Sequence, residues 1–209
     1  MELKAEDAGF RYDKTSWVFR HITLELHPEE IVGLVAPSGT GKSTLAKLFA
    51  GYEEPSEGVI TLDGHPLNKT GFCPVQLMYQ NPEKAVNPDW TMHQILTECW
   101  SPDEEVLSLL KIRPEWYNRY PSELSGGELQ RFCIARVLCP ETKFLIADEI
   151  TTMFDAVTQA GIWKMLLSMT ERRQMGMLVI THDMALAGRV CSRIVRLTTD
   201  CDIEKKCMY

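Results

Sequence analysis

The chain has 209 residues, of which 44% are hydrophobic, and this is enough for one compact domain with a sizeable core. The formal net charge is −7 and no long basic stripe with interleaved aromatic residues occurs, so nucleic acid is not expected as a partner. No run of about 18 apolar residues is present, which argues against a membrane-spanning helix.

The cysteines and the N-terminus both favour a cytoplasmic protein. The 7 cysteines are scattered and form no C-x-x-C pair, which is typical of reduced thiols. The first residues do not resemble a signal peptide. Cys201 and Cys207 are interpreted as ordinary thiols in preference to metal ligands.

The first third of the chain reads as strands with one helix. Residues 1–35 alternate apolar and polar positions, so that Ile22, Leu24 and Leu26 share one face. The continuous apolar run at 31–35 predicts a buried parallel strand, and apolar residues after Lys42 recur at helical spacing. Further strands are predicted at 58–62, before an Asp-Gly turn, and at 75–79.

The pattern then changes to short helices separated by prolines between residues 81 and 121. Alternation of helices and strands resumes after residue 125. We expect helices at 126–138 and 155–172, strands at 143–147 and 177–181, another short helix, and a last strand at 193–197.

These elements predict an α/β fold. It would have a mostly parallel sheet with helices, an N-terminal antiparallel β part and a small helical subdomain. The expected organisation is a single domain over residues 1–209, with an α/β core at 1–80 and 124–209 and the helical subdomain at about 81–123.

A glycine-rich loop follows the strand at 31–35 and opens a helix, which is the context that a phosphate-binding loop requires. Its backbone N–H groups and the helix N-terminus favour phosphate, Lys42 can reach the β- and γ-phosphates, and the Ser43 hydroxyl can ligate Mg²⁺. The predicted nucleotide-binding residues of this loop are Ala36, Pro37, Ser38, Gly39, Thr40, Gly41, Lys42, Ser43 and Thr44.

Ala36 stands where the usual pattern has glycine. If that position needs a positive φ, alanine costs on the order of 1–3 kcal/mol. If it needs only a small side chain, alanine is tolerated.

Polar residues end three further strands. Asp148 and Glu149 follow an apolar strand, so that Asp148 can bind the Mg²⁺ shell and Glu149 can take a proton from the attacking water or orient it. His182 is interpreted as a γ-phosphate contact, and the Gln80 amide could reach the metal or the water. The simpler alternatives are a helix N-cap for the two acids and an ordinary polar strand end for His182.

A second glycine-rich turn, Ser125-Gly126-Gly127-Glu128, opens a helix with an apolar face. Serine and glycines at a helix start favour an anion, although an ordinary N-cap is the alternative. Because the first loop already surrounds its own nucleotide, we expect this turn to serve the γ-phosphate held by another copy.

Taken in order, these residues resemble the ATP-binding subunit of an ABC transporter, over nearly the whole chain. The resemblance implies that the α/β fold has a P-loop NTPase core. The resemblance makes residues 36–44 the Walker A loop, Gln80 the Q-loop glutamine, Ser125–Glu128 the signature, and Asp148-Glu149 the end of Walker B. It also makes Tyr12 the aromatic residue that stacks on adenine, Asp155 the D-loop aspartate that links the two sites, and His182 the switch histidine.

The stretch from Gln80 to Pro88 is similar to the Q-loop of the dipeptide, oligopeptide and nickel importers. The chain departs from the family pattern in three places: Ala36, Ile150 in place of a proline, and the pair Met153-Phe154 in place of Ala-Leu. They raise the alternative of a weakly hydrolytic regulatory subunit.

The resemblance implies an ATPase that uses ATP and Mg²⁺, dimerises with a copy or a sibling subunit, and closes on ATP to drive transport. It implies permease subunits, a solute-binding protein, a place at the cytoplasmic face of the membrane, and peptide or nickel-type cargo. Catalysis would fall on Glu149, His182, Gln80 and Lys42, and the metal on Ser43, Gln80 and Asp148. The alternative class is a soluble ABC-type ATPase that acts on DNA or ribosomes. The sequence does not identify the cargo.

Overall fold

The computed structural model describes residues 1–37, 39–68, 70–197 and 203–206. Ser38 of the predicted phosphate loop, Cys201 and Cys207 lie outside the described residues. Within the described part, no helix combines the length and the apolar character needed to cross a membrane.

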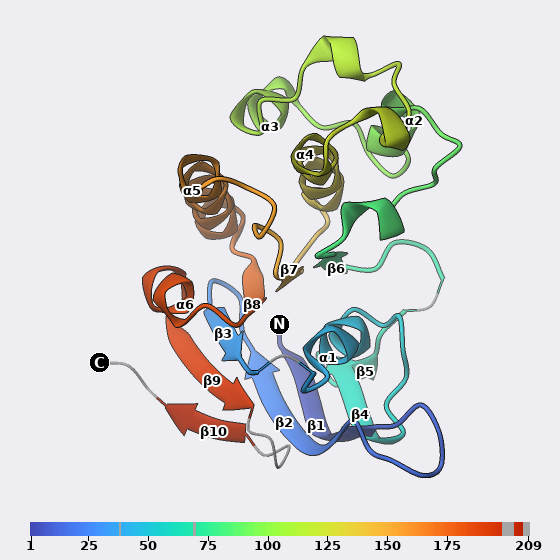
Figure 1. Cartoon of the computed structure of the whole chain (residues 1–209). Helices are drawn as coiled ribbons and strands as arrows, with labels where there is room; N and C mark the ends of the chain where they lie inside the picture. Colours follow the sequence, from blue (N-terminus) through green and yellow to red (C-terminus); the bar gives the residue numbers. More distant parts are fainter. Residues whose placement is uncertain (38, 69, 198–202, 207–209) are drawn as a thin grey trace.

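Two sheets form the body of the protein (Figure 1). Their strands are β1 (Leu3–Phe10), β2 (Phe19–Leu26), β3 (Ile31–Val35), β4 (Glu57–Leu62), β5 (His65–Pro66), β6 (Val75–Met78), β7 (Phe144–Asp148), β8 (Gly176–Thr181), β9 (Arg193–Leu197) and β10 (Ile203–Lys206). One sheet is antiparallel, with the order β2-β1-β4-β5. The other has the order β10-β9-β3-β8-β7-β6 and is parallel except for β10. The expected α/β fold with an N-terminal antiparallel part is confirmed.

The helices agree with the predicted pattern to within a few residues. They are α1 (Lys42–Phe49), α2 (Met92–Leu96), α3 (Glu104–Leu109), α4 (Gly126–Val137), α5 (Ala156–Arg173) and α6 (Met184–Val190), with short 3-10 helices at Pro82–Lys84, Pro114–Trp116 and Pro121–Glu123. The antiparallel edge strand β10 was not predicted, because residues 203–206 have one apolar residue followed by three charged ones and show no apolar alternation.

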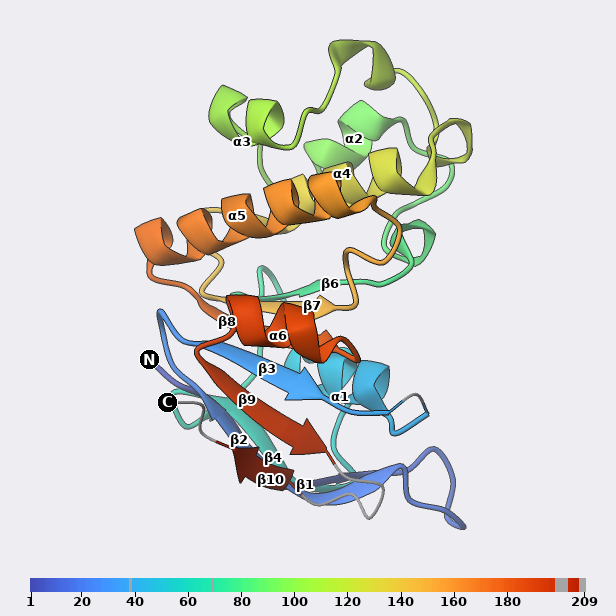
Figure 2. The same cartoon turned by 60° about the vertical axis from the view of Figure 1, so that its left-hand side comes forward.

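The parallel sheet separates two hydrophobic clusters because side chains along a strand alternate between its faces. On β7, Leu145 and Ala147 pack with α4 and α5, whereas Phe144 and Ile146 pack with α1 and the antiparallel sheet. Figure 2 shows the resulting layers, with α4 and α5 on one side of β7 and α1 on the other. Every residue of β7 is buried, as its continuous apolar run predicts.

The segment between β6 and β7 carries the short helices, which lie away from the sheets at the top of Figure 1. Its core forms around Phe132 of α4, whose ring lies 6.3 Å from the rings of Trp116 and Tyr117. The same cluster continues through Leu145 to the sheet, so one core joins both parts. The division into subdomains at residues 80 and 124 stays a prediction.

The loop between β3 and α1 bends at its glycines. Gly39 and Gly41 have φ values of 84° and 83°, in the left-handed region that glycine adopts without strain. Ala36 is not among the residues with positive φ, and its side chain is buried. Position 36 therefore needs a small side chain and not a left-handed backbone.

We expect the Phe132→Ala substitution to lower the free energy of unfolding by about 3–5 kcal/mol, because it leaves a cavity in a fully buried aromatic site. Leu109→Ala on α3 is the matched control, since the Leu109 side chain is 48% exposed, and it should change the free energy by less than about 0.5 kcal/mol. Urea denaturation measures both. Equal losses would contradict the placement of Phe132 in the core.

The two loop positions should respond in different ways to exchange between alanine and glycine. Ala36→Gly adds freedom to the unfolded chain and relieves no strain, so it should lower the free energy of unfolding by about 0.4–1 kcal/mol. Gly41→Ala should cost more, because its φ is 83° and an added Cβ would lie 2.4 Å from Cγ1 of Val18. Urea denaturation of the two variants gives the comparison, and a stabilising Ala36→Gly would overturn the backbone assignment.

Candidate active site

Polar residues gather at the carboxyl edge of the parallel sheet because its strands run in register. Val35 of β3 lies opposite Thr181 of β8, Asp148 of β7 lies opposite Ile180, and Met78 of β6 lies opposite Ala147. The segments that follow these strands therefore start side by side. In open α/β sheets, ligands bind at this edge.

Glu149 is the centre of the site. Its Oε1 lies 3.0 Å from Nδ1 of His182 and 3.8 Å from Nζ of Lys42, and its Oε2 accepts a hydrogen bond of 3.0 Å from Nε2 of Gln80. Lys42, Gln80 and His182 thus each lie beside Glu149, and the four predicted catalytic residues come from segments that follow four different strands. The Glu149 side chain is only 12% exposed and that of Lys42 only 8% exposed, so the pair lies largely out of water.

The backbone of Glu149 is unusual, with a φ of 49°. A non-glycine residue in the left-handed region costs of order 1–3 kcal/mol and persists only where its surroundings hold it. Here the Glu149 N–H donates to the Ile180 carbonyl at 3.0 Å, which continues the ladder between β7 and β8 by one residue. This backbone turn directs the Glu149 carboxylate toward the glycine loop. No sequence pattern predicted the left-handed backbone at this residue.

Lys42 also bonds to the loop that precedes it. Its ammonium donates to the carbonyl oxygens of Ala36 at 3.0 Å and of Pro37 at 2.9 Å. The loop is therefore closed around the amine that phosphate would contact.

Asp148 is buried beside Ser43. Burial raises the pKa of its carboxyl, while a hydrogen bond from Ser43 acts in the opposite direction. Its Oδ1 is buried and has no hydrogen-bond partner among the described residues. An orphaned carboxylate oxygen next to a hydroxyl suits a hard cation such as Mg²⁺, which prefers oxygen ligands.

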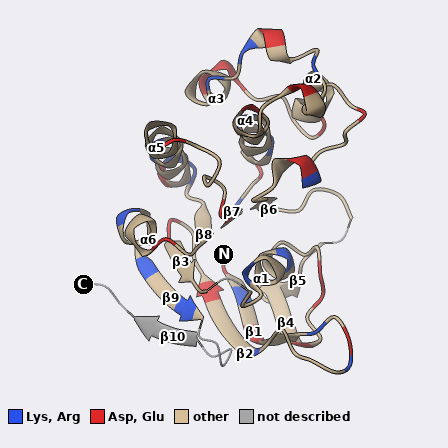
Figure 3. Ribbon diagram, viewed as in Figure 1, with Lys and Arg blue, Asp and Glu red and all other residues tan. Residues whose placement is uncertain are grey.

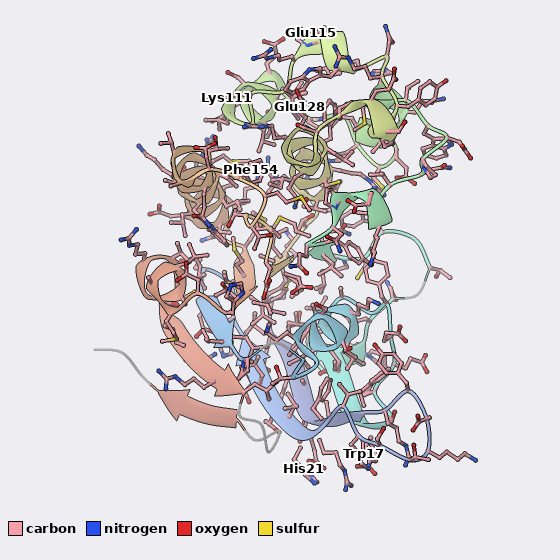
Figure 4. All side chains as sticks on the ribbon, in the orientation of Figure 1. Trp17, His21, Lys111, Glu115, Glu128 and Phe154 are labelled. Carbon is pink, nitrogen blue, oxygen red and sulfur yellow. The ribbon has the colours of Figure 1, made fainter. Side chains whose placement is uncertain are left out.

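Tyr12 stands at the other end of the glycine loop. Its hydroxyl forms a 2.9 Å hydrogen bond with Oγ1 of Thr44, and the residue is 68% exposed. The hairpin that carries it is held by Trp17, labelled in Figure 4, between the guanidinium groups of Arg11 and Arg20 at 4.6 and 4.5 Å from the ring centroid. An exposed aromatic face is therefore fixed beside α1.

The second glycine-rich turn forms a capping box. Ser125 Oγ accepts from the Glu128 N–H at 3.3 Å, and the Ser125 N–H donates to Oε2 of Glu128 at 2.8 Å. This bonding lowers the pKa of Glu128. Gly126 is exposed, so backbone N–H groups at the helix start face outward.

The predicted residues thus fall into separate groups. Across the described ranges, no hydrogen bond or ion pair joins the turn at 125–128 to the Glu149 cluster. Asp155 is the N-cap of α5, where its carboxylate accepts from the N–H groups of Val157 and Thr158.

Sequence reasoning missed two buried residues that support the site. Thr151 accepts hydrogen bonds from Gln159 and Trp163 of α5, and Gln130 of α4 donates to the Tyr79 carbonyl at 3.2 Å. Both read as ordinary polar positions in the sequence, and only the side-chain contacts reveal them.

Comparison with known proteins agrees with this geometry. Residues 19–152 match the ABC transporter family. The chain is similar to the nickel import ATP-binding protein NikE of Escherichia coli strain K12, with 36% identity over 197 residues that cover 85% of this chain and 74% of the relative. The same protein from Shigella dysenteriae serotype 1 has the same identity and coverage.

Solved structures share the fold. A dimeric ABC transporter cassette, MJ0796, has a TM-score of 0.82 and 23% identity, and the match covers 99% of this chain and 100% of that one. An ATP-binding subunit of an ABC transporter has a TM-score of 0.81 and 22% identity, with 98% of this chain and 90% of that one covered. The chain therefore belongs to the ABC transporter family as an ATP-binding subunit, and it is an ATPase.

Proposed function

We propose that this chain closes on ATP as a head-to-tail dimer and thereby drives the import of a substrate through separate membrane subunits. The observation that carries the proposal is the carboxylate of Glu149, which contacts Lys42, Gln80 and His182 at one sheet edge. A second phosphate-type turn at Ser125 has no bond to that cluster in the described residues, which leaves it available to another copy.

Hydrolysis in this proposal depends on positioning and charge. Lys42 binds the β- and γ-phosphates, whose oxygens compete with the Ala36 and Pro37 carbonyls for its ammonium. Glu149 orients the attacking water and accepts its proton. Gln80 and His182 hold the carboxylate in place from opposite sides, and His182 also contacts the γ-phosphate.

Asp148, Ser43 and Gln80 would hold Mg²⁺, and the unpartnered Oδ1 of buried Asp148 supports this assignment. The ion, when bound, neutralises charge on the phosphates. The remaining nucleotide contacts would come from Tyr12, stacked on adenine, and from the loop at 36–44.

The partner's share of each site would be the signature. Ser125, Gly126 and Gly127, with Glu128 fixing the turn, would cover the γ-phosphate held by a second ATPase subunit, either a copy or a sibling. Asp155 would link the two sites from the start of α5. The dimeric form of the similar cassette MJ0796 supports this arrangement.

Transport would require permease subunits and a solute-binding protein, with this chain at the cytoplasmic face of the membrane. The helical part at about 81–123 would move about Gln80 and act on the permease. The name of the NikE relatives favours nickel, and peptides remain the alternative cargo.

Figure 3 shows acidic and basic residues interspersed over the described elements, and with a net charge of −7 this argues against a DNA- or ribosome-directed ATPase.

Glu149→Gln should reduce ATP hydrolysis by about 10²–10⁴-fold, because the amide cannot accept the proton. The same variant should accumulate ATP-dependent dimers, which sedimentation velocity detects. Glu115→Gln, a change to an exposed carboxylate on the helical part, serves as the control and should hydrolyse ATP normally. Wild-type turnover in Glu149→Gln would exclude the base assignment.

A tagged version of this chain, purified from its own cells in mild detergent, should retain a protein with membrane-spanning helices. Mass spectrometry of the purified complex identifies that subunit, and the purification should be repeated at high salt to remove loosely bound material. Stable association with ribosomes or DNA in place of a membrane subunit would contradict the transport function.

A further inference from the structure

The pair Met153-Phe154, which departs from the family pattern, lies against the signature turn. A Cβ added to Gly127 would lie 3.2 Å from Cε1 of Phe154, and one added to Gly126 would lie 2.9 Å from Sδ of Met153. Figure 4 labels Phe154 between α5 and α4. The two side chains therefore occupy the space that the signature glycines leave open.

The Phe154 ring also meets Arg131, one turn further along α4. The Arg131 guanidinium carbon lies 5.5 Å from the ring centroid, within the range of a cation–π contact. Nη1 of Arg131 donates to the Leu110 carbonyl at 2.8 Å, at the end of α3. Arg131 thus joins the signature helix, the helical part and the segment after β7.

The segment between Glu149 and Phe154 is short and held at several points. Thr152 N–H donates to the Glu149 carbonyl, and Phe154 N–H donates to the Thr151 carbonyl at 3.2 Å. The Thr151 hydroxyl oxygen accepts from Gln159 and Trp163, which fixes the middle of the segment on α5. Hydrogen bonds therefore tie the turn between Glu149 and the Phe154 ring at several points.

We propose that Phe154 is a positioning residue that couples the chain's own Glu149 to its own signature turn, and so sets how tightly that turn binds ATP held by a second copy. The inference rests on the dimer of the proposed function. In this coupling, ATP bound at the chain's own site contacts Glu149. The turn after Glu149 then positions the Phe154 ring and Arg131, and these align Ser125–Gly127 toward the ATP of the partner.

A merely structural role and a positioning role differ in what they change. If Phe154 only fills space, its loss lowers the stability of the subunit and leaves the ATP dependence of dimerisation unchanged. If it positions the signature turn, its loss weakens ATP-dependent dimerisation while ATP binding to the single subunit stays intact, because no hydrogen bond or ring contact in the described residues joins Phe154 to the loop at 36–44.

The test uses Glu149→Gln as the parent, with sedimentation velocity across an ATP titration. Adding Phe154→Ala or Arg131→Lys should raise the ATP concentration for half-maximal dimer about threefold to tenfold. Phe154→Tyr, which keeps the ring, should restore the parent value. Because both single changes disrupt the contact between the ring and the guanidinium, the effect of the double change at 131 and 154 should be smaller than the sum of the two single effects.

Two measurements separate the outcomes. Calorimetric ATP binding to the monomer should stay within about twofold in every variant. Phe72→Ala is the matched aromatic control, because Phe72 precedes β6 and lines a cavity near Val137, at the opposite end of α4 from the signature turn, and it should leave the dimer midpoint unchanged. A parent that forms no ATP-dependent dimer refutes the proposed function itself. A parent that dimerises, with an unchanged midpoint in Phe154→Ala, overturns the coupling.

Discussion

The parallel register of β3, β8, β7 and β6 is the constraint on which the rest of the structure depends. It brings the strand ends to one edge, so residues far apart in the sequence become neighbours without any local signal. Lys42, Gln80, Glu149 and His182 meet there around one carboxylate. Helices α4 and α5 pack on one face of this sheet and α1 packs on the other, so the segments that bear the functional residues start from fixed positions along the sheet edge.

Burial of charge explains why the site needs all of its members. Lys42 and Glu149 are both almost fully covered, and a buried charge without a partner costs several kcal/mol. The Gln80 amide, the His182 ring and the Ala36 carbonyl supply the hydrogen bonds that compensate for lost water. Glu149 also has a left-handed backbone, which its bond to Ile180 maintains. Strain and burial are thus concentrated at Glu149, the residue proposed as the catalytic base.

Most elements could be predicted from the sequence because their signals are local. Continuous apolar strands such as 31–35, glycine loops before helices, and proline-separated short helices each reflect one principle acting over a few residues. The side-chain bonds could not be predicted in the same way. The φ of Glu149, the buried bond from Gln130 to Tyr79 and the packing of Phe154 on Gly127 depend on which elements become neighbours. The same holds for Ala36. Whether alanine fits at this position of the loop depends on the backbone φ there, which the sequence motif does not specify.

Contacts connect α4 to Glu149 by two separate routes. Gln130 bonds to Tyr79, the residue before Gln80, and Gln80 bonds to Glu149 at 3.0 Å. The turn after Glu149 returns to α4 through Phe154, which lies against Gly127 and Arg131. In the proposed coupling, a change in the bond between Gln80 and Glu149 would therefore act on α4 at two places, through Gln130 and through Phe154.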